Sequence, residues 1–136
     1  MNFTLQRQIT VAIENQPGRL AAISKALAAS GINIKDLSIL DNIEQGVIRM
    51  VTNDAAACKA LLVAHGFHPV EAEVVVLDLA DTPGRLAVLA DALANGGVNI
   101  DYAYGSEEPA EQKMRLVMKL SPLSRACEII RALGEA

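Results

Sequence analysis

The sequence predicts an α+β protein made of two consecutive βαββαβ repeats, each an antiparallel sheet with its helices on one face. Three observations support this fold class. The chain has 136 residues, of which 51% are apolar, and this is enough to bury a core. Its apolar residues alternate in some segments and recur at helical spacing in others. Two groups of residues also recur in the same order at one fixed separation.

The internal repeat is the most specific of these observations. Asn15-Gln16-Pro17-Gly18-Arg19-Leu20 recurs as Asp81-Thr82-Pro83-Gly84-Arg85-Leu86, and Gly31-Ile32-Asn33-Ile34 recurs as Gly97-Val98-Asn99-Ile100. The separation is the same, since 81 − 15 and 97 − 31 are both 66. Two motifs that repeat in register indicate duplication, and we predict domains at residues 1–73 and 74–136. A unit of ~60 residues is marginal alone, so each must pack against the other, another chain, or both.

The first repeat begins with a predicted strand, because apolar residues alternate at Ile9, Val11 and Ile13. A helix follows, with Pro17 suited to its first position and Gly31 to its end. Its apolar face contains Leu20, Ile23 and Leu27. We then expect strands at residues 32–40 and 47–51, joined by a turn at 42–46. A helix is expected at 54–65, with Cys58, Leu61 and Leu62 on one face and Gly66 as its stop. Extended chain is expected from residue 67.

The second repeat has the same predicted order. It begins with a strand that contains Val75, Leu77 and Leu79, followed by a helix from Pro83 with Leu86, Leu89 and Leu93. A strand at 98–104 and a polar loop at 106–112 come next. The repeat ends with a strand that contains Met114, Leu116, Met118 and Leu120, and with a last helix. Ser121 and Pro122 suit the N-cap and first position of that helix. Its apolar face contains Ala126, Cys127, Ile130 and Leu133.

The second repeat lacks a final strand of its own. A full strand follows Gly66, whereas only two residues follow Gly134. One hypothesis is that residues 68–79 serve both repeats, as the last strand of one and the first of the next. Alternatively, a partner chain fills the gap, because an unpaired sheet edge invites another strand. The segment 74–79 has apolar residues on both faces, which indicates a strand with more burial.

Composition and motifs exclude several functions. The net charge of −4 and the 3% of aromatic residues disfavour nucleic-acid binding. The sequence shows no apolar run of ~20 residues and no signal peptide. Cys58 and Cys127 give neither a disulfide framework nor a metal spacing. No nucleophile-elbow, P-loop or zinc-protease motif is present. We therefore expect a cytoplasmic protein that is no enzyme, needs no cofactor or metal, and binds no membrane or nucleic acid.

The predicted order is that of a ferredoxin-like fold. The Asn-x-Pro-Gly-x-Leu turn, followed about 13 residues after its Gly by Gly-(Ile/Val)-Asn-Ile, resembles the ACT domain. The resemblance covers nearly the whole chain as a tandem pair. It implies a non-catalytic regulatory protein that binds a small molecule, with an amino acid expected, at interfaces between ACT units. Such a protein modulates a metabolic enzyme or its own assembly, and we expect a homodimer.

The resemblance also implies which residues bind the ligand. In ACT domains the turn of one unit holds the ligand and the second strand of a neighbouring unit closes the site. Carried over, the polar contacts are Asn15 and Asn33 in the first repeat and Asp81 and Asn99 in the second. The full predicted set is Asn15, Gln16, Pro17, Gly18, Arg19, Leu20, Ile32, Asn33, Ile34, Asp81, Thr82, Pro83, Gly84, Arg85, Leu86, Val98, Asn99 and Ile100. Asp81 departs from the Asn of the family.

The residues themselves suit this chemistry. Gly18 and Gly84 let a ligand approach the backbone, and a helix N-terminus favours a carboxylate. Asn15 can accept from an ammonium and donate to a carboxylate. Ionised Asp81 only accepts, so it repels a carboxylate. The hypothesis is that Asn15 and Asn33 form the better amino-acid site.

Several of these residues also have simpler interpretations. The Pro-Gly pairs fit a tight turn without any ligand, and Asn33 and Asn99 suit backbone groups at a strand entry. We expect Arg19 and Arg85 to be solvated, and Tyr102 and Tyr104 to cover the sheet or line a pocket. Cys58 and Cys127 are expected in the core, and His65 and His68 in a loop. The acidic residues Glu107, Glu108 and Glu111 are expected to form a solvated charge run.

Two alternative functions stay open. One is a constitutive regulatory subunit of an amino-acid biosynthetic enzyme, similar to the small subunit of acetolactate synthase, which the Glu-Asn-Gln-Pro-Gly-Arg-Leu segment resembles. The other is a dimerisation scaffold that binds no ligand. Asp81 and the missing strand favour the scaffold for the second repeat.

Overall fold

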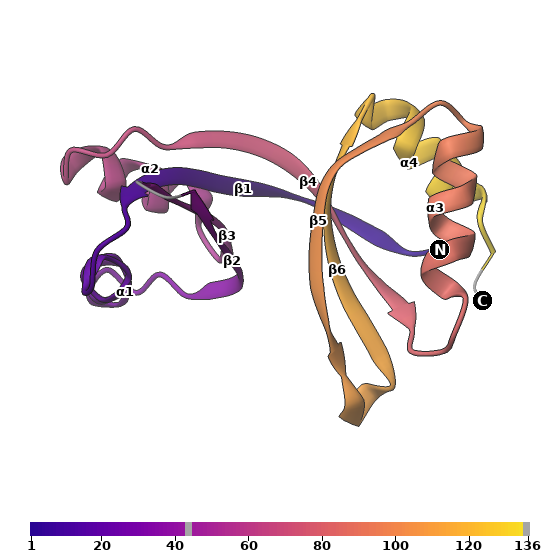
Figure 1. Ribbon diagram of the computed structural model, residues 1–136, viewed down its shortest axis with the longest axis horizontal. Helices are drawn as coiled ribbons and strands as arrows, with labels where there is room; N and C mark the ends of the chain where they lie inside the picture. The colour runs from indigo at the N-terminus through magenta and orange to yellow at the C-terminus, as the bar shows by residue number, and fades with distance from the viewer. Residues whose placement is uncertain (43–44, 135–136) are drawn as a thin grey trace. The chain divides into compact units, whose positions relative to one another are not determined.

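The computed structural model describes residues 1–42 and 45–134, and these form six strands and four α-helices (Figure 1). The elements are β1 (Phe3–Glu14), α1 (Arg19–Ala29), β2 (Ile34–Asn42), β3 (Gln45–Thr52), α2 (Ala55–Ala64), β4 (Val70–Ala80), α3 (Arg85–Asn95), β5 (Asn99–Glu108), a short 3₁₀ helix (Pro109–Glu111), β6 (Lys113–Ser121) and α4 (Leu123–Ala132). They form two compact units. We call residues 7–72 the first unit, and residues 1–6 with 73–136 the second unit.

The first unit is held together by β3, which pairs antiparallel with both β1 and β2. Its register sets Val11 opposite Ile48 and Ile9 opposite Met50, and all four side chains are at most 1% exposed. Because alternate residues of a strand share a face, these side chains lie together under the helices. The core also contains Ile23 and Leu27 of α1 and Cys58 and Leu62 of α2.

The second unit repeats this arrangement around β6, which pairs antiparallel with β4 and β5. Val75 lies opposite Met118 and Leu77 opposite Leu116. Helices α3 and α4 lie side by side on one face of these strands (Figure 1). Their fully buried residues are Leu89, Leu93, Ala126 and Ile130. Val74, Val76 and Val117 are also buried, as the apolar residues on both faces of residues 74–79 predict.

Strand β4 runs unbroken from the first unit into the second. Residues 70–72 belong to the first unit and residues 73–80 to the second. The segment between the repeats therefore serves both, as one of the two sequence hypotheses states, although the strand begins at Val70 rather than at residue 68. These compact units differ from the predicted domains, residues 1–73 and 74–136, because residues 1–6 belong to the second unit. Those limits, which describe the repeats, remain a prediction.

The start of the same chain takes the position for which the sequence analysis left a partner chain as the alternative. Residues 1–6 pack in the second unit, and β1 neighbours β4 in the strand order. Met1 and Phe3 contact its core, and the Arg131 guanidinium lies 5.2 Å from the centre of the Phe3 ring. The N-terminal ammonium donates to the carbonyl oxygens of Ile130, at 3.3 Å, and Leu133. Strand β1 begins at Phe3, well before the alternating apolar residues at positions 9–13 from which a strand is predicted.

Three of the described helices end at a glycine, as predicted for Gly31 and Gly66. Gly31, Gly66 and Gly97 each have a positive φ after the last helical turn. After α1, Gly31 N–H donates to Ala28 and Ile32 N–H donates to Leu27, which is a Schellman motif. The same pair of bonds follows α2 and α3. Each α-helix has 10 or 11 residues, and no helix of the described residues is long and apolar enough to cross a membrane.

Several predicted boundaries are wrong. Helices α1 and α3 begin at Arg19 and Arg85, so Pro17 and Pro83 precede the glycine N-cap instead of occupying the first helical position. Pro122 is the N-cap of α4, and Ser121 ends β6. The fixed φ of proline fits a turn position as well as the first position of a helix. A proline alone therefore does not determine the residue at which a helix begins.

The loops are shorter than predicted. Residues 106–108 belong to β5, where they pair with residues 113–115; polar side chains suit an edge strand whose faces are exposed. Asn42, Gln45 and Gly46 belong to strands, and residues 43–44 of the predicted turn lie outside the described residues. Strand β2 begins at Ile34 rather than Ile32. Leu86, predicted in the apolar face of α3, is 47% exposed.

Substitution of Gly18 or Gly84 by alanine is expected to destabilise the fold by about 1–2 kcal/mol, because a Cβ is strained at a positive φ. The φ angles are 89° and 93°, and the space around both positions is open, so crowding does not contribute. Denaturant unfolding measures the loss. Gly134→Ala is the matched control, at an open position without a positive φ. Unchanged stability in both turn variants would contradict the role of these glycines.

Truncation of Phe3 to alanine is expected to lower the free energy of unfolding by about 2 kcal/mol, less than for a fully buried Phe, because the ring is only partly buried. Leu5→Ala on the same strand, 43% exposed, is the matched control and is expected to cost less than about 1 kcal/mol. Denaturant unfolding gives both values. Equal losses would show that residues 1–6 do not anchor through Phe3.

Candidate functional site

The two Pro-Gly turns have the same backbone. In the first, Gln16 N–H donates to Glu14 O (2.9 Å) and Ala22 N–H to Gly18 O (3.0 Å). In the second, Thr82 N–H donates to Ala80 O (2.9 Å) and Val88 N–H to Gly84 O (3.0 Å). Neither helix that follows has a side-chain N-cap. N–H groups at such a helix start are available to an anion such as a carboxylate.

The side chains of the first turn are held by local contacts. Asn15 Nδ2 donates to Asp41 Oδ1 at 2.8 Å. Arg19 Nη2 donates to Glu14 Oε2 at 2.7 Å and to Gln16 Oε1 at 3.4 Å. Leu20 packs partly buried against the core. The turn therefore presents an oriented amide beside the start of α1.

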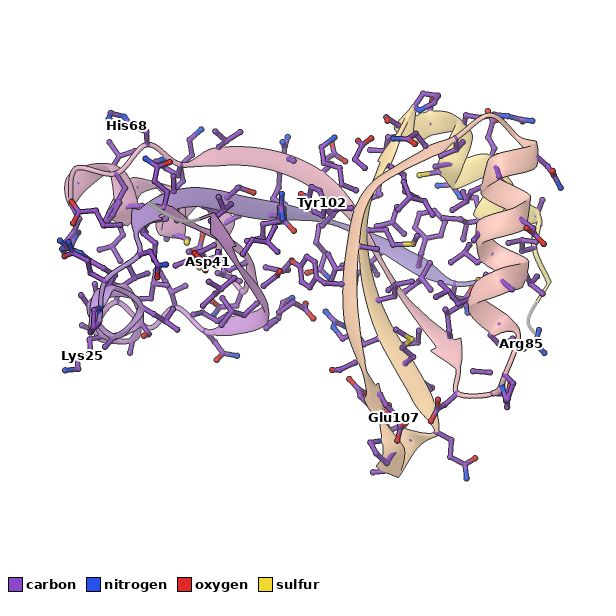
Figure 2. All side chains as sticks on the ribbon, in the orientation of Figure 1. Lys25, Asp41, His68, Arg85, Tyr102 and Glu107 are labelled. Carbon is purple, nitrogen blue, oxygen red and sulfur yellow. The ribbon has the colours of Figure 1, made fainter. Side chains whose placement is uncertain are left out.

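The second turn carries different chemistry. Asp81 N–H donates to Gln112 O at 3.0 Å. The Asp81 side chain takes the place of Asn15, and Ala80 takes the place of Glu14, so Arg85 has no acid at the position that pairs with Arg19. A surface hollow of about 540 Å³ is lined by Ala80, Asp81, Thr82, Glu107, Pro109 and Gln112. Glu107 lies near the end of the β5–β6 hairpin, and Arg85 lies at the start of α3 (Figure 2).

The strand entries are fixed by hydrogen bonds of two kinds. The backbone of Asn33 makes two hydrogen bonds with Asn53: the Asn33 N–H donates to the side-chain Oδ1 of Asn53 (2.9 Å), and the Asn53 N–H donates to the Asn33 carbonyl oxygen (3.1 Å). Asn99 Nδ2 instead donates to Asp101 Oδ1 at 2.8 Å. Ile32 and Val98 are buried, and Ile34 and Ile100 pack against the two cores. The contacts of Asn33 and Asn99 therefore agree with the simpler interpretation, in which both residues have a structural role at a strand entry.

Within one unit, the structure does not bring the two predicted motifs together. Asn15 follows the pair Glu14–Gln45, at one end of the β1–β3 ladder. Asn33 precedes the pair Ile34–Thr52, at the other end of β3. A strand of eight residues such as β3 spans roughly 25 Å. The second unit has the same separation, because Asp81 follows the pair Ala80–Lys113 and Asn99 pairs with Ser121.

Other candidate side chains lie on α2 and α4 or at the end of α2. Cys58 and Cys127 are buried, and burial, followed by the charge of Asp54, raises the pKa of Cys58 to about 11. His65 Nδ1 lies 2.9 Å from Leu61 O. The part of the chain that the structure describes contains no cluster of three His, Cys, Asp or Glu side chains able to hold a metal ion.

Sequence reasoning missed two acidic residues, Asp41 and Asp101. Asp101 accepts hydrogen bonds from Asn99 Nδ2, Ser121 Oγ (2.9 Å) and Lys119 Nζ (3.2 Å). These bonds, with that of Asn99 the largest cause, lower the pKa of the Asp101 carboxyl below its ordinary value. For Asp41 the sequence does contain a signal. The repeat offset of 66 matches Asp41 with Glu107, an acidic residue that lines the hollow at the second turn.

The Asp101 cluster gives a pH prediction. A carboxyl whose pKa is lower in the folded state stabilises the fold above its unfolded pKa of ~3.9, and this stabilisation is lost as the pH falls through the folded pKa. Asp101→Asn is therefore expected to lower the unfolding free energy at neutral pH and to converge with the unsubstituted protein in acid. Denaturant unfolding over a pH series measures this. Asp91→Asn, at an exposed position of α3, controls for the lost charge, and a pH-independent difference would contradict the assignment.

Comparison with known proteins agrees with the fold. A family model described as an ACT domain pair matches residues 3–132. Protein BT0572 from Bacteroides thetaiotaomicron is 26% identical, with a TM-score of 0.88 over 96% of this chain and 90% of that chain. The regulatory subunit of aspartate kinase from Thermus thermophilus is 20% identical, with a TM-score of 0.69 over 96% of both chains.

The corresponding subunit from Thermus flavus is 22% identical, with a TM-score of 0.67 over 97% of this chain and 94% of that chain. At this identity the two Thermus subunits show a shared fold. No curated protein matches the sequence. The family model, however, covers nearly the whole length, including both Pro-Gly turns and both strand entries. The chain therefore belongs to the ACT domain pair family.

Proposed function

We propose that this protein is a regulatory protein that binds a free amino acid at the β1–α1 turn of the first unit. The observation that carries the proposal is the pairing of an oriented Asn15 amide with the uncapped start of α1. Backbone N–H groups at a helix start suit the carboxylate of an amino acid. The carbonyl oxygen of Asn15 suits its ammonium. The two groups common to all amino acids thus have complementary partners at one turn.

The second half of the binding site comes from another ACT unit in this proposal. Asn33 and Asp41 lie at opposite ends of the β2–β3 ladder. A ligand at the turn that contains Asn15 therefore cannot also reach Asn33 of the same unit. In ACT domains a strand of a neighbouring unit closes the site, and a second copy of the chain in a homodimer is one source of such a strand. A ligand held by two ACT units stabilises the arrangement that forms the complete site, and this differential affinity is the basis of regulation.

The regulated partner is proposed to be an enzyme of amino-acid metabolism. Two structures with the same fold are named regulatory subunits of aspartate kinase, which supports a catalytic partner of this kind. They equally support a second candidate function, a regulatory subunit that binds its enzyme constitutively. Co-purification of a larger catalytic subunit without added amino acid distinguishes this second function from ligand-dependent regulation.

Thermal unfolding against the twenty amino acids at millimolar concentration tests the proposal. A ligand at 100 times its Kd stabilises the folded state by about 2.7 kcal/mol, which raises Tm by several degrees for a chain of this size. The chain contains no Trp, so an external dye or far-UV circular dichroism follows unfolding. We expect a selective shift that Asn15→Ala abolishes.

The matched control is Lys25→Ala, which changes an exposed side chain of α1 outside the turn (Figure 2) and is expected to retain the shift. A shift that survives Asn15→Ala would place the ligand elsewhere. No shift with any amino acid would contradict ligand binding and favour the constitutive subunit.

A further inference from the structure

The orientation of the Asn15 amide depends on a residue 26 positions away. Asp41 Oδ1 accepts the hydrogen bond from Asn15 Nδ2 at 2.8 Å. An ionised carboxylate has no proton to donate, so only the nitrogen end of the amide can face it. The oxygen and the nitrogen of an amide point in different directions from the carbon that they share. The carbonyl oxygen of Asn15 is therefore directed away from Asp41.

The sheet places Asp41 where it can do this. Asp41 lies opposite Gly46 in the β2–β3 ladder, next to the pair Asn42–Gln45. Gln45 also lies opposite Glu14 in the β1–β3 ladder, and Asn15 follows Glu14 directly. The end of β3 thus brings the end of β2 and the end of β1 to one place. Asn15 and Asp41 are both exposed, so the bond itself lies at the surface, at a place that the strand register sets.

The second repeat has carboxylates at both equivalent positions. The repeat offset of 66 places Asp81 at the position of Asn15 and Glu107 at that of Asp41. Both line the hollow of about 540 Å³ beside the second turn. When ionised, neither can donate to the other, and together they repel a carboxylate. The second turn therefore keeps the backbone of the first without its oriented amide.

We infer that Asp41 is a positioning residue, which holds the Asn15 carbonyl oxygen toward the ammonium of an amino acid, and that the second turn binds no amino acid. This rests on the proposed function. Without Asp41, the Asn15 amide rotates freely and offers its nitrogen as readily as its oxygen. The preference of the first turn for ligands that carry an ammonium is then weaker. One amino acid binds per chain.

The preference for an ammonium is the first test. The probes are the L-amino acids that raise Tm in the panel, each with its matching hydroxy acid, such as L-alanine with L-lactate or L-phenylalanine with L-phenyllactate. The hydroxy acid retains the carboxylate and replaces the ammonium by a hydroxyl. Asp41→Ala is expected to lower the affinity ratio of amino acid to hydroxy acid by about twofold, because the free amide then presents its oxygen to the ammonium in only about half of the molecules.

Two further variants complete this test. Asp41→Asn keeps an acceptor oxygen and is expected to retain part of the preference, which a purely structural role of Asp41 would not produce. Asp91→Ala, at an exposed position of α3, is the charge control and is expected to leave the ratio unchanged. Circular dichroism without ligand verifies folding of each variant. An unchanged ratio in folded Asp41→Ala that still binds amino acids would overturn the role of Asp41 and leave the proposed function intact.

The number of sites is the second test. Isothermal titration calorimetry of the unsubstituted chain is expected to give one amino acid per chain. Asp81→Asn restores an amide beside Glu107 and is expected to raise this number to two, whereas Asp91→Asn leaves it at one. Two sites in the unsubstituted chain, or one in Asp81→Asn, would overturn the assignment of the second turn. No binding to the unsubstituted chain would overturn the inference together with the proposed function.

Discussion

The pairing of β1 with β3 is the constraint on which the rest of the first unit depends. The register that sets Ile9 opposite Met50 and Val11 opposite Ile48 places these four side chains in the core. A slip of one residue would turn the apolar side chains of β1 to the other face, so burial of the core fixes the register. That register also ends at Glu14 and Gln45. The position of Asn15 beside Asp41 is therefore a consequence of packing several residues away.

The two repeats share a backbone but not a surface chemistry. The N-cap glycines have φ angles of 89° and 93° and the same hydrogen-bond pattern. Around this common turn, an amide held by a carboxylate in the first repeat is replaced by two carboxylates in the second. The ion pair of Arg19 with Glu14 is absent from the second turn, where residue 80 is alanine; such an exposed pair contributes little stability. Duplication has kept the geometry that glycine permits, while exposed side chains have diverged.

The predicted binding residues divide by what fixes them. Asn33 is held through its backbone by Asn53, and Asn99 and Ser121 hold Asp101. These contacts stabilise the starts of β2 and β5 whether or not a ligand binds. Asn15 differs, because its amide is held by an exposed partner at an edge of the sheet and its helix has no side-chain cap. The first turn therefore combines an oriented polar group with backbone donors, and the proposed binding of an amino acid rests on this combination.

The sequence by itself determined the repeat, the order of strands and helices, most of the apolar faces and the glycine helix ends. These depend on local periodicity and on the φ angles that only glycine adopts easily. The tertiary structure decided what depends on residues far apart in the chain. Phe3 completes the second unit because its ring finds a core formed by residues 75–133, and no local pattern shows that destination. The separation of Asn15 from Asn33, and the contact of Asn15 with Asp41, follow from strand register, which is set by burial across the sheet and not by spacing along the chain.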